Sequence, residues 1–168
     1  MVELMVALTI AAILLMIAVP GFRSLIQNQR MTTTVNEVFM AINLTRSEAI
    51  QRGTRVDLVP AGDGTDWTTG WVVFIDKNND QKRQDGEQII FTHGAVPDGM
   101  TIHFAFTDSS RQYLAYNGTG HSRTNTSSQT PQLGTMSFTL DKQVRRIKIN
   151  FAGRPRVCNP ATDSGNCQ

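Results

Sequence analysis

The chain has 168 residues, of which 40% are apolar and 18% charged, an ordinary balance for one globular domain with a sizeable core. The formal net charge is only +2, so the total charge does not indicate a general affinity for nucleic acid. The charge is uneven, however, and local patches matter more than totals for anion binding. Positions 142 to 156 hold six basic residues and no acid: Lys142, Arg145, Arg146, Lys148, Arg154 and Arg156.

The first predicted element is an apolar stretch, residues 4–19, in which Thr9 is the one polar residue. As a helix rising about 1.5 Å per residue it spans roughly 24 Å, a little less than the ~30 Å hydrocarbon layer. The alternatives are a buried core helix and a cleaved secretory signal. A signal needs a basic n-region and a small-residue cleavage site, whereas Glu3 is acidic and IAVPGF offers no such site. We therefore expect a retained membrane helix.

The next stretch predicts a second, different half of the same helix. Pro20 follows the apolar stretch and is expected to interrupt the helix there. Glu3 lies at the other end of the apolar stretch; a carboxylate is costly in lipid, and one found there is usually functional or paired. Farther on, apolar residues recur mostly at three- and four-residue steps, which predicts an amphipathic helix ending near Gly53. These apolar positions are Leu25, Met31, Val35, Val38, Phe39, Ile42, Ala49 and Ile50.

The segments VELMVALTIAAILLMIAVPGFRSLIQNQR and TRSEAIQRG resemble the N-terminal helix of the type IV pilin class, and within it the FimT/GspH family of minor pilins and pseudopilins. The segments GWVVFIDKNND, DGEQII and RRIKINFAGRPRV extend the resemblance along the whole chain. In that family a basic leader, a Gly and a Phe-Thr-Leu sequence precede the Glu-containing stretch, and Met1 stands at the place of this Leu. We expect either a start codon farther upstream or a trimmed chain.

The resemblance implies an α+β fold, in which a long N-terminal helix packs on an antiparallel β-sheet head. It implies a transmembrane and filament-assembly helix, residues 1–27, and a head, residues 28–168, made of an amphipathic helix (28–53) and a β-rich part (54–168). It further implies that Glu3 attracts the N-terminal amine of a neighbouring pilin or pseudopilin. The expected location is a single pass through the inner membrane with the head in the periplasm, and a pilus or pseudopilus filament.

After Gly53 the apolar period changes to two, which predicts about seven short antiparallel strands. Their sequences are RVDLV, WVVFI, QIIFT, TIHFAF, YLAY, MSFTL and RRIKINF. The run WVVFI is apolar throughout, as in a strand covered on both faces. Two sets of alternating residues are each expected to share one face: Ile102, Phe104 and Phe106, and Ile147, Ile149 and Phe151. The polar, turn-rich residues 117–134 are expected to form a long mobile loop.

One loop of the head spaces its oxygen ligands like a calcium-binding loop. Positions one, three, five and twelve of residues 76–87 are Asp76, Asn78, Asp80 and Glu87. However, Gln81 stands where the sharp turn of a calcium loop needs Gly, strands flank the loop, and Lys82 and Arg83 reduce its negative charge. We therefore expect a solvated hairpin loop there and no metal site.

The remaining motifs do not indicate an enzyme. His93, His103 and His121 lack the spacing of metal ligands, and GTG at 118–120 is too short for a phosphate-binding loop. The sequence contains neither GxSxG nor HExxH. We therefore expect no catalytic site, no cofactor and no small-molecule substrate.

Cys158 and Cys167 lie near the C-terminus, separated by eight residues. A zinc site would need further Cys or His ligands, and no cluster supplies them. Two free thiols remain an alternative, but the turn-forming residues between the cysteines cannot stabilise a loop by burial. A disulfide is therefore predicted, and it implies an oxidising compartment.

The segment GRPR, residues 153–156, is the candidate ligand-binding motif. Gly153 permits a sharp turn and close approach of a ligand, and Pro155 biases Arg154 to an extended conformation. Two preorganised guanidinium groups suit two backbone phosphates, and Arg146 and Lys148 would extend the track. The alternative is a strand end with solvated arginines.

In the FimT branch of the family, a C-terminal Gly-Arg-x-Arg motif binds DNA in natural transformation, and residues 153–156 match it. No aromatic ladder lies alongside, so base stacking and sequence reading are not expected. The resulting prediction is a minor type IV pilin with weak, sequence-independent DNA binding during uptake. The alternative is a GspH-like minor pseudopilin of a type II secretion system, whose head would contact other pseudopilins or a secretion substrate.

Overall fold

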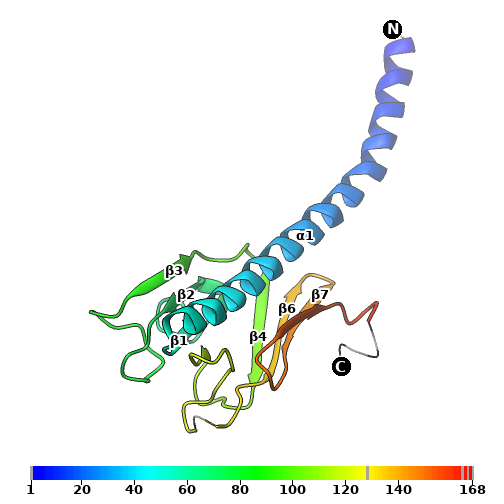
Figure 1. Cartoon of the computed structure of the whole chain (residues 1–168). Coiled ribbons are helices and arrows are strands. Elements are labelled where there is room, and N and C mark those ends of the chain that lie inside the picture. Colours follow the sequence, from blue (N-terminus) through cyan, green and yellow to red (C-terminus); the bar gives the residue numbers. More distant parts are fainter. Residues whose placement is uncertain (1, 128, 164, 166, 168) are drawn as a thin grey trace.

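The computed structural model describes residues 2–127, 129–163, 165 and 167, and only the backbone of residues 17–20. It consists of one long helix, α1 (Val2–Arg52), followed by a head of two four-stranded antiparallel sheets (Figure 1). This arrangement confirms the expected α+β fold, with a long N-terminal helix on an antiparallel head.

Helix α1 is continuous through Pro20, so the predicted interruption at this residue is wrong. A proline removes one backbone donor and crowds the preceding turn, and helices commonly bend at such a residue without ending. The N-terminal half of α1 projects away from the head along a curved path (Figure 1). The helix ends as predicted at Gly53, whose φ of 64° is a left-handed conformation that terminates helices.

The second half of α1 packs on the head through one face. Its buried apolar residues are Met31, Val35, Val38, Ala41, Ile42 and Ala49. Leu25 and Ile50 were predicted on this face but are 62% and 50% exposed. Leu25 lies N-terminal to Met31, the first buried apolar residue among the described side chains of α1, and Ile50 lies beside Gly120.

The two sheets have simple antiparallel orders. The first sheet is ordered β3-β2-β1-β5, comprising β1 (Val56–Pro60), β2 (Trp71–Phe74), β3 (Ile89–His93) and β5 (Leu114–Tyr116). The second is ordered β4-β6-β7-β8, comprising β4 (Met100–Phe106), β6 (Gly134–Leu140), β7 (Gln143–Ile149) and β8 (Pro155–Cys158). A short 3₁₀ helix, η1 (Trp67–Thr69), joins β1 to β2.

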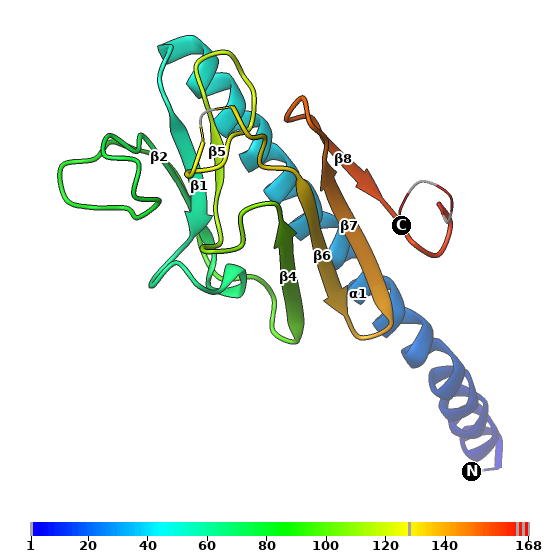
Figure 2. The ribbon, with the colours of Figure 1, turned by 90° about the horizontal axis from the view of Figure 1, so that it is seen from below.

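Helix α1 runs across both sheets and contacts strands of each, so one core cluster joins the helix to the two sheets (Figure 2). Ile102, Phe104 and Phe106 of β4 all face this cluster, as predicted. All four residues of β2 are buried, because Val72 and Phe74 belong to a second cluster on the sheet's other face. The prediction of a strand covered on both faces is therefore confirmed.

The last part of the head differs from the prediction. Seven predicted strands correspond to β1 to β7, but β8 was missed because Pro and Arg residues do not alternate with apolar ones. Strand β7 ends at Ile149, and residues 150–154 form a turn into β8. Phe151 therefore lies in the turn, 75% exposed, and its predicted place in the core is wrong.

Residues 117–134 are tied to the head at several points, in place of the expected mobile loop; position 128 lies outside the described residues. Ser122 forms a β-bridge with Tyr116, and the Arg123 N–H donates to the Ala115 carbonyl at 3.0 Å. Gln132 is fully buried, and its amide group bonds the backbone of Asp108. The polar residues of this segment thus serve its own anchoring.

Candidate nucleic-acid interface

The turn between β7 and β8 is held by its own hydrogen bonds. The Asn150 side-chain oxygen accepts from the N–H groups of Ala152 and Arg154, both at 3.0 Å. The Gly153 N–H donates to the Asn150 carbonyl at 2.9 Å, and the Asn150 N–H donates to the Arg154 carbonyl at 3.3 Å. An Asn that bonds backbone donors ahead of it is a common way to close a turn, so this one has little conformational freedom.

Gly153 lies where the turn meets the rest of the head. Its φ is 73°, and a Cβ there would lie 2.8 Å from both the Ser122 nitrogen and a ring carbon of Tyr116. The buried Tyr116 hydroxyl donates to the Gly153 carbonyl at 2.6 Å. Burial raises the pKa of Tyr116, so its hydroxyl remains a donor at neutral pH. The close approach that Gly153 permits is therefore made by the head's own residues, not by a ligand as the sequence suggested.

The register of β7 and β8 places the basic residues on one face. Lys148 pairs with Arg156, and Arg146 pairs with Cys158, so these side chains share a face, opposite the buried Ile147 and Ile149. Strand β6 continues this face with hydroxyl groups, because Thr135 pairs with Lys148 and Ser137 with Arg146. None of the four strands contains an acidic residue. We call this surface the outer face of the second sheet.

Arg145 and Arg146 are both engaged by contacts within the chain. The Arg145 guanidinium turns to the helix side and donates to the Asn28 side chain at 3.2 Å. Arg146 is half-buried, and its guanidinium donates to the Cys167 carbonyl at 2.6 Å. Arg146 therefore holds the C-terminal tail, which weakens the prediction that it extends a phosphate track.

The tail is closed by the predicted disulfide, which joins Cys158 to Cys167. Both cysteines are buried, at 3% and 1% exposure. Within the described residues, the disulfide and the bond from Arg146 together fix the tail beside β8.

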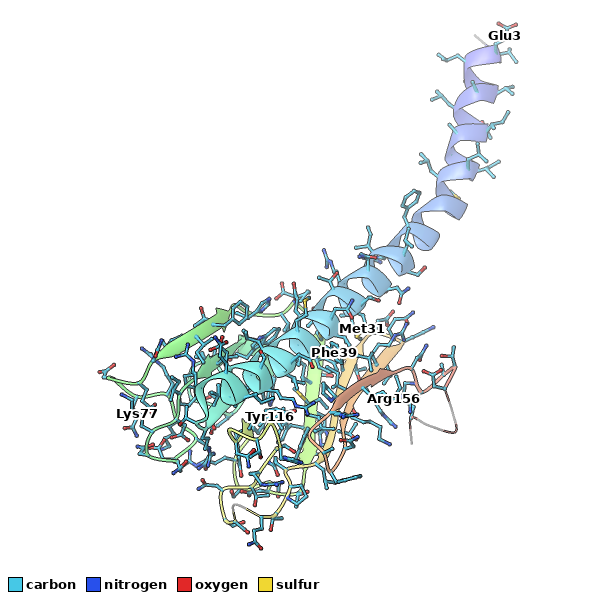
Figure 3. The ribbon with its side chains drawn as sticks, viewed as in Figure 1. Glu3, Met31, Phe39, Lys77, Tyr116 and Arg156 are labelled. Carbon is cyan, nitrogen blue, oxygen red and sulfur yellow. A yellow bond between two sulfur atoms is a disulfide. The ribbon has the colours of Figure 1, made fainter. Side chains whose placement is uncertain are left out.

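Arg154 and Arg156 have exposed side chains, and Pro155 separates them. Within the described part of the chain neither guanidinium group makes an ion pair. An exposed guanidinium fork without a carboxylate partner can bind a phosphate or carboxylate through two parallel hydrogen bonds. The site thus offers two such forks at an edge strand, beside an acid-free surface; Arg156 is labelled in Figure 3.

The 76–87 loop uses its carboxylates internally. Asp76 accepts from the N–H groups of Asn79 at 2.6 Å and Gln81 at 3.0 Å, and Glu87 accepts from those of Lys77 and Gln84. Asn78 and Asp80 likewise bond within the loop. Over the described residues, no group of three or more His, Cys, Asp or Glu side chains is arranged to hold a metal.

A buried charge cluster was missed by the sequence reading. The Arg55 guanidinium bonds both oxygens of Asp57, at 2.7 and 2.8 Å, and lies 3.7 Å from Asp76. Burial raises the pKa of the Asp57 carboxyl to about 7, against the opposing effect of Arg55. The sequence contained one signal for this cluster, the Arg-x-Asp spacing of residues 55 and 57 at the start of β1. The cluster anchors the 76–87 loop to β1, away from the outer face of the second sheet.

The three histidines do not come together. The His93 ring stacks on Trp71 with centroids 4.0 Å apart, and its Nε2 lies 3.3 Å from a Glu37 carboxylate oxygen. His103 is exposed on β4, and His121 lies beside Thr119. His93 packs on Trp71, His103 and His121 lie on the surface, and the three histidines form no common site.

Glu3 lies at the far end of α1 from the head (Figure 3). The helix is long and apolar enough, by length and composition, to cross a membrane, and none of its most apolar stretch is buried against the head. Large apolar side chains such as Leu4, Leu8 and Leu15 are more than half exposed. This part of α1 therefore needs an apolar environment outside its own chain.

Comparisons with known proteins agree with this architecture. The chain is similar to the type IV minor pilin FimU of Pseudomonas aeruginosa, with a TM-score of 0.59 and 16% identity over 84% of this chain and 97% of that chain. It is also similar to the minor pseudopilin EpsH from the type 2 secretion system of Vibrio cholerae, with a TM-score of 0.54 and 14% identity over 78% of this chain and 98% of that chain. At such identities these likenesses show the fold alone.

The sequence family described as type II transport protein GspH matches residues 34–153, more than half of the chain. None of the curated proteins compared with the chain matches it. The matched region includes Gly153 but ends before Arg154 and Arg156. The chain belongs to the GspH family, as a GspH-like minor pilin or pseudopilin with the type IV pilin fold.

Proposed function

We propose that this protein is a minor type IV pilin whose head binds DNA through its phosphate backbone during DNA uptake in natural transformation. One observation carries the proposal: Arg154 and Arg156 are exposed and without ion-pair partners among the described residues, at a hydrogen-bonded turn beside an acid-free sheet face. Phosphate contacts carry no base information, so binding is independent of sequence. Two contacts make it weak for one head.

The anchoring follows from the same proposal. The assembly segment, residues 1–27, which includes the first half of α1 (Val2–Arg52), crosses the inner membrane and packs with other pilins, and residues 28–168 form the head in the periplasm. Glu3, exposed in the isolated chain, attracts the terminal amine of a neighbouring subunit. A bilayer or a filament core supplies the apolar surroundings that the exposed first half of α1 requires.

The test is a titration of the full chain in detergent with labelled duplex DNA at several salt concentrations. Two neutralised phosphates predict a slope of log affinity against log salt of about −2, from roughly −0.9 per phosphate. The Arg154→Ala and Arg156→Ala variants should each weaken DNA binding and flatten the salt slope. The double variant should lose most of the DNA binding. Arg→Lys should restore only part of the loss, because an ammonium group lacks the planar fork.

The matched control is Arg111→Ala. It removes the same charge from an exposed position beside Asp63 and Lys82, outside the turn at residues 150–154 and outside the strands of the second sheet. It should leave DNA affinity close to that of the parent. A double Arg154/Arg156 variant that binds as tightly as the parent overturns the proposal.

The second candidate function is a minor pseudopilin of a type II secretion system. It is favoured by the family's description and by the likeness to EpsH. Deletion of the gene would then reduce protein secretion and leave transformation unchanged, which is the reverse of what the first proposal expects.

A further inference from the structure

We infer that the DNA-binding turn prefers single strands, because Phe151 presents a ring on which an unpaired base stacks. This inference rests on the proposed DNA binding and adds the form of DNA that is bound. It also revises the expectation that the protein does not stack on bases, which rested on the lack of an aromatic ladder beside the arginines.

The exposure of Phe151 is unusual within the head. At 75% it exceeds that of every other large apolar side chain described beyond α1, of which the next is Ile89 at 41%. The ring would continue the buried row of Ile147 and Ile149 if β7 were two residues longer. Instead the chain turns at Asn150, and the ring is left in solvent.

The backbone that carries the ring is fixed on both sides. The Asn150 side chain bonds the N–H groups of Ala152 and Arg154, and the Tyr116 hydroxyl bonds the Gly153 carbonyl. A contact made from a fixed turn loses little conformational entropy on binding. Phenylalanine has no polar group to bond, so its ring recognises a ligand only through apolar and stacking contact.

The charges around the turn decide which ligand fits. The Asn150 N–H donates to the Arg154 carbonyl at 3.3 Å, which brings the backbones on either side of Phe151 together. The ring and the Arg154 guanidinium therefore leave from the same short turn, with Arg156 two residues on. A stacking ring beside phosphate-binding groups is the combination found in proteins that bind single strands. In a duplex the bases are already stacked and paired, so the ring gains nothing there.

The test uses the full chain in detergent and three labelled oligonucleotides: a single strand, the same sequence as duplex, and an abasic strand of equal length. Phe151→Ala should lower affinity for the single strand about fivefold or more, the lower end of the effect of base–aromatic stacking. Affinity for the duplex and for the abasic strand should change less than twofold. Phe151→Tyr should keep the parent's affinity, and Phe151→Leu should behave like Phe151→Ala, because leucine is apolar but has no π face. The salt slope should stay unchanged.

Three results would overturn the inference. If Arg154→Ala weakens binding to all three oligonucleotides and Phe151→Ala changes none, the DNA-binding proposal stands and the stacking role is wrong. If Phe151→Ala leaves single-strand affinity intact but lowers incorporation into filaments, the ring is a contact between subunits. If neither Arg154→Ala nor Phe151→Ala lowers the affinity for any of the three oligonucleotides, the DNA-binding proposal is contradicted as well. Melting temperatures of the Phe151 variants should equal the parent's, since the ring is not buried.

Discussion

Gly153 shows how closely single residues set the geometry of the turn. A Cβ at this position meets Tyr116 and the Ser122 nitrogen at 2.8 Å, and φ is 73°. Gly153→Ala should therefore destabilise the chain by about 1–3 kcal/mol and also weaken DNA binding by displacing Arg154. Gly94→Ala is the control, because its Cβ would have nothing within 4 Å. Thermal unfolding measures the difference; equal melting temperatures for the two variants would contradict this account.

Asp57 makes stability depend on pH. Its pKa in the folded chain is about 7, above the usual value near 4, so the folded state binds the proton more tightly. The stability it contributes is fully present below about pH 4 and is lost as the pH rises through about 7. Asp57→Asn should therefore flatten stability against pH over this window. Denaturant titrations from pH 4 to 8 measure it, with exposed Asp63→Asn as control; an unchanged profile in Asp57→Asn would exclude this role.

At the scale of elements, β8 depends on its links to the tail. It is a four-residue edge strand, and the disulfide closes the loop that follows it. In the chain-entropy model a loop of this length contributes about 2–3 kcal/mol. Cys158→Ser with Cys167→Ser should lower the melting temperature, and reductant should lower that of the parent to the same value. Alkylation of protein from an oxidising compartment should find no free thiol.

The whole molecule divides its surface between two kinds of contact. The head buries its own core, whereas the first half of α1 keeps its apolar side chains exposed. Glu3 lies in that exposed half, remote from every head contact (Figure 3). Glu3→Ala should therefore leave the melting temperature of the head unchanged and reduce incorporation into filaments. Fractionation of sheared filaments measures this, with Glu48→Ala, near the head, as a control that keeps incorporation; normal incorporation of Glu3→Ala would show that its carboxylate is not used in assembly.

The sequence by itself determined the elements whose residues repeat locally. The apolar run of α1, the three- and four-residue spacing from Met31 to Ala49, and the alternation of β4 each encode which side is buried, because helix and strand have fixed periods. Gly53 marked the helix end for the same local reason. The disulfide was also readable, since only two cysteines exist and they enclose turn residues.

Only the tertiary structure decided where the basic and aromatic residues of the last segment lie. Strand β8 forms by pairing with β7, a contact between chain segments that no local period reports. That pairing places Arg156 beside Lys148 and leaves Phe151 outside the core. The Arg146 guanidinium donates to the Cys167 carbonyl in the tail. Arg55 pairs with two buried carboxylates, Asp57 in β1 and Asp76 in the 76–87 loop. Such arrangements depend on the distances between different segments of the folded chain. The composition and the spacing of residues in the sequence give no information about these distances.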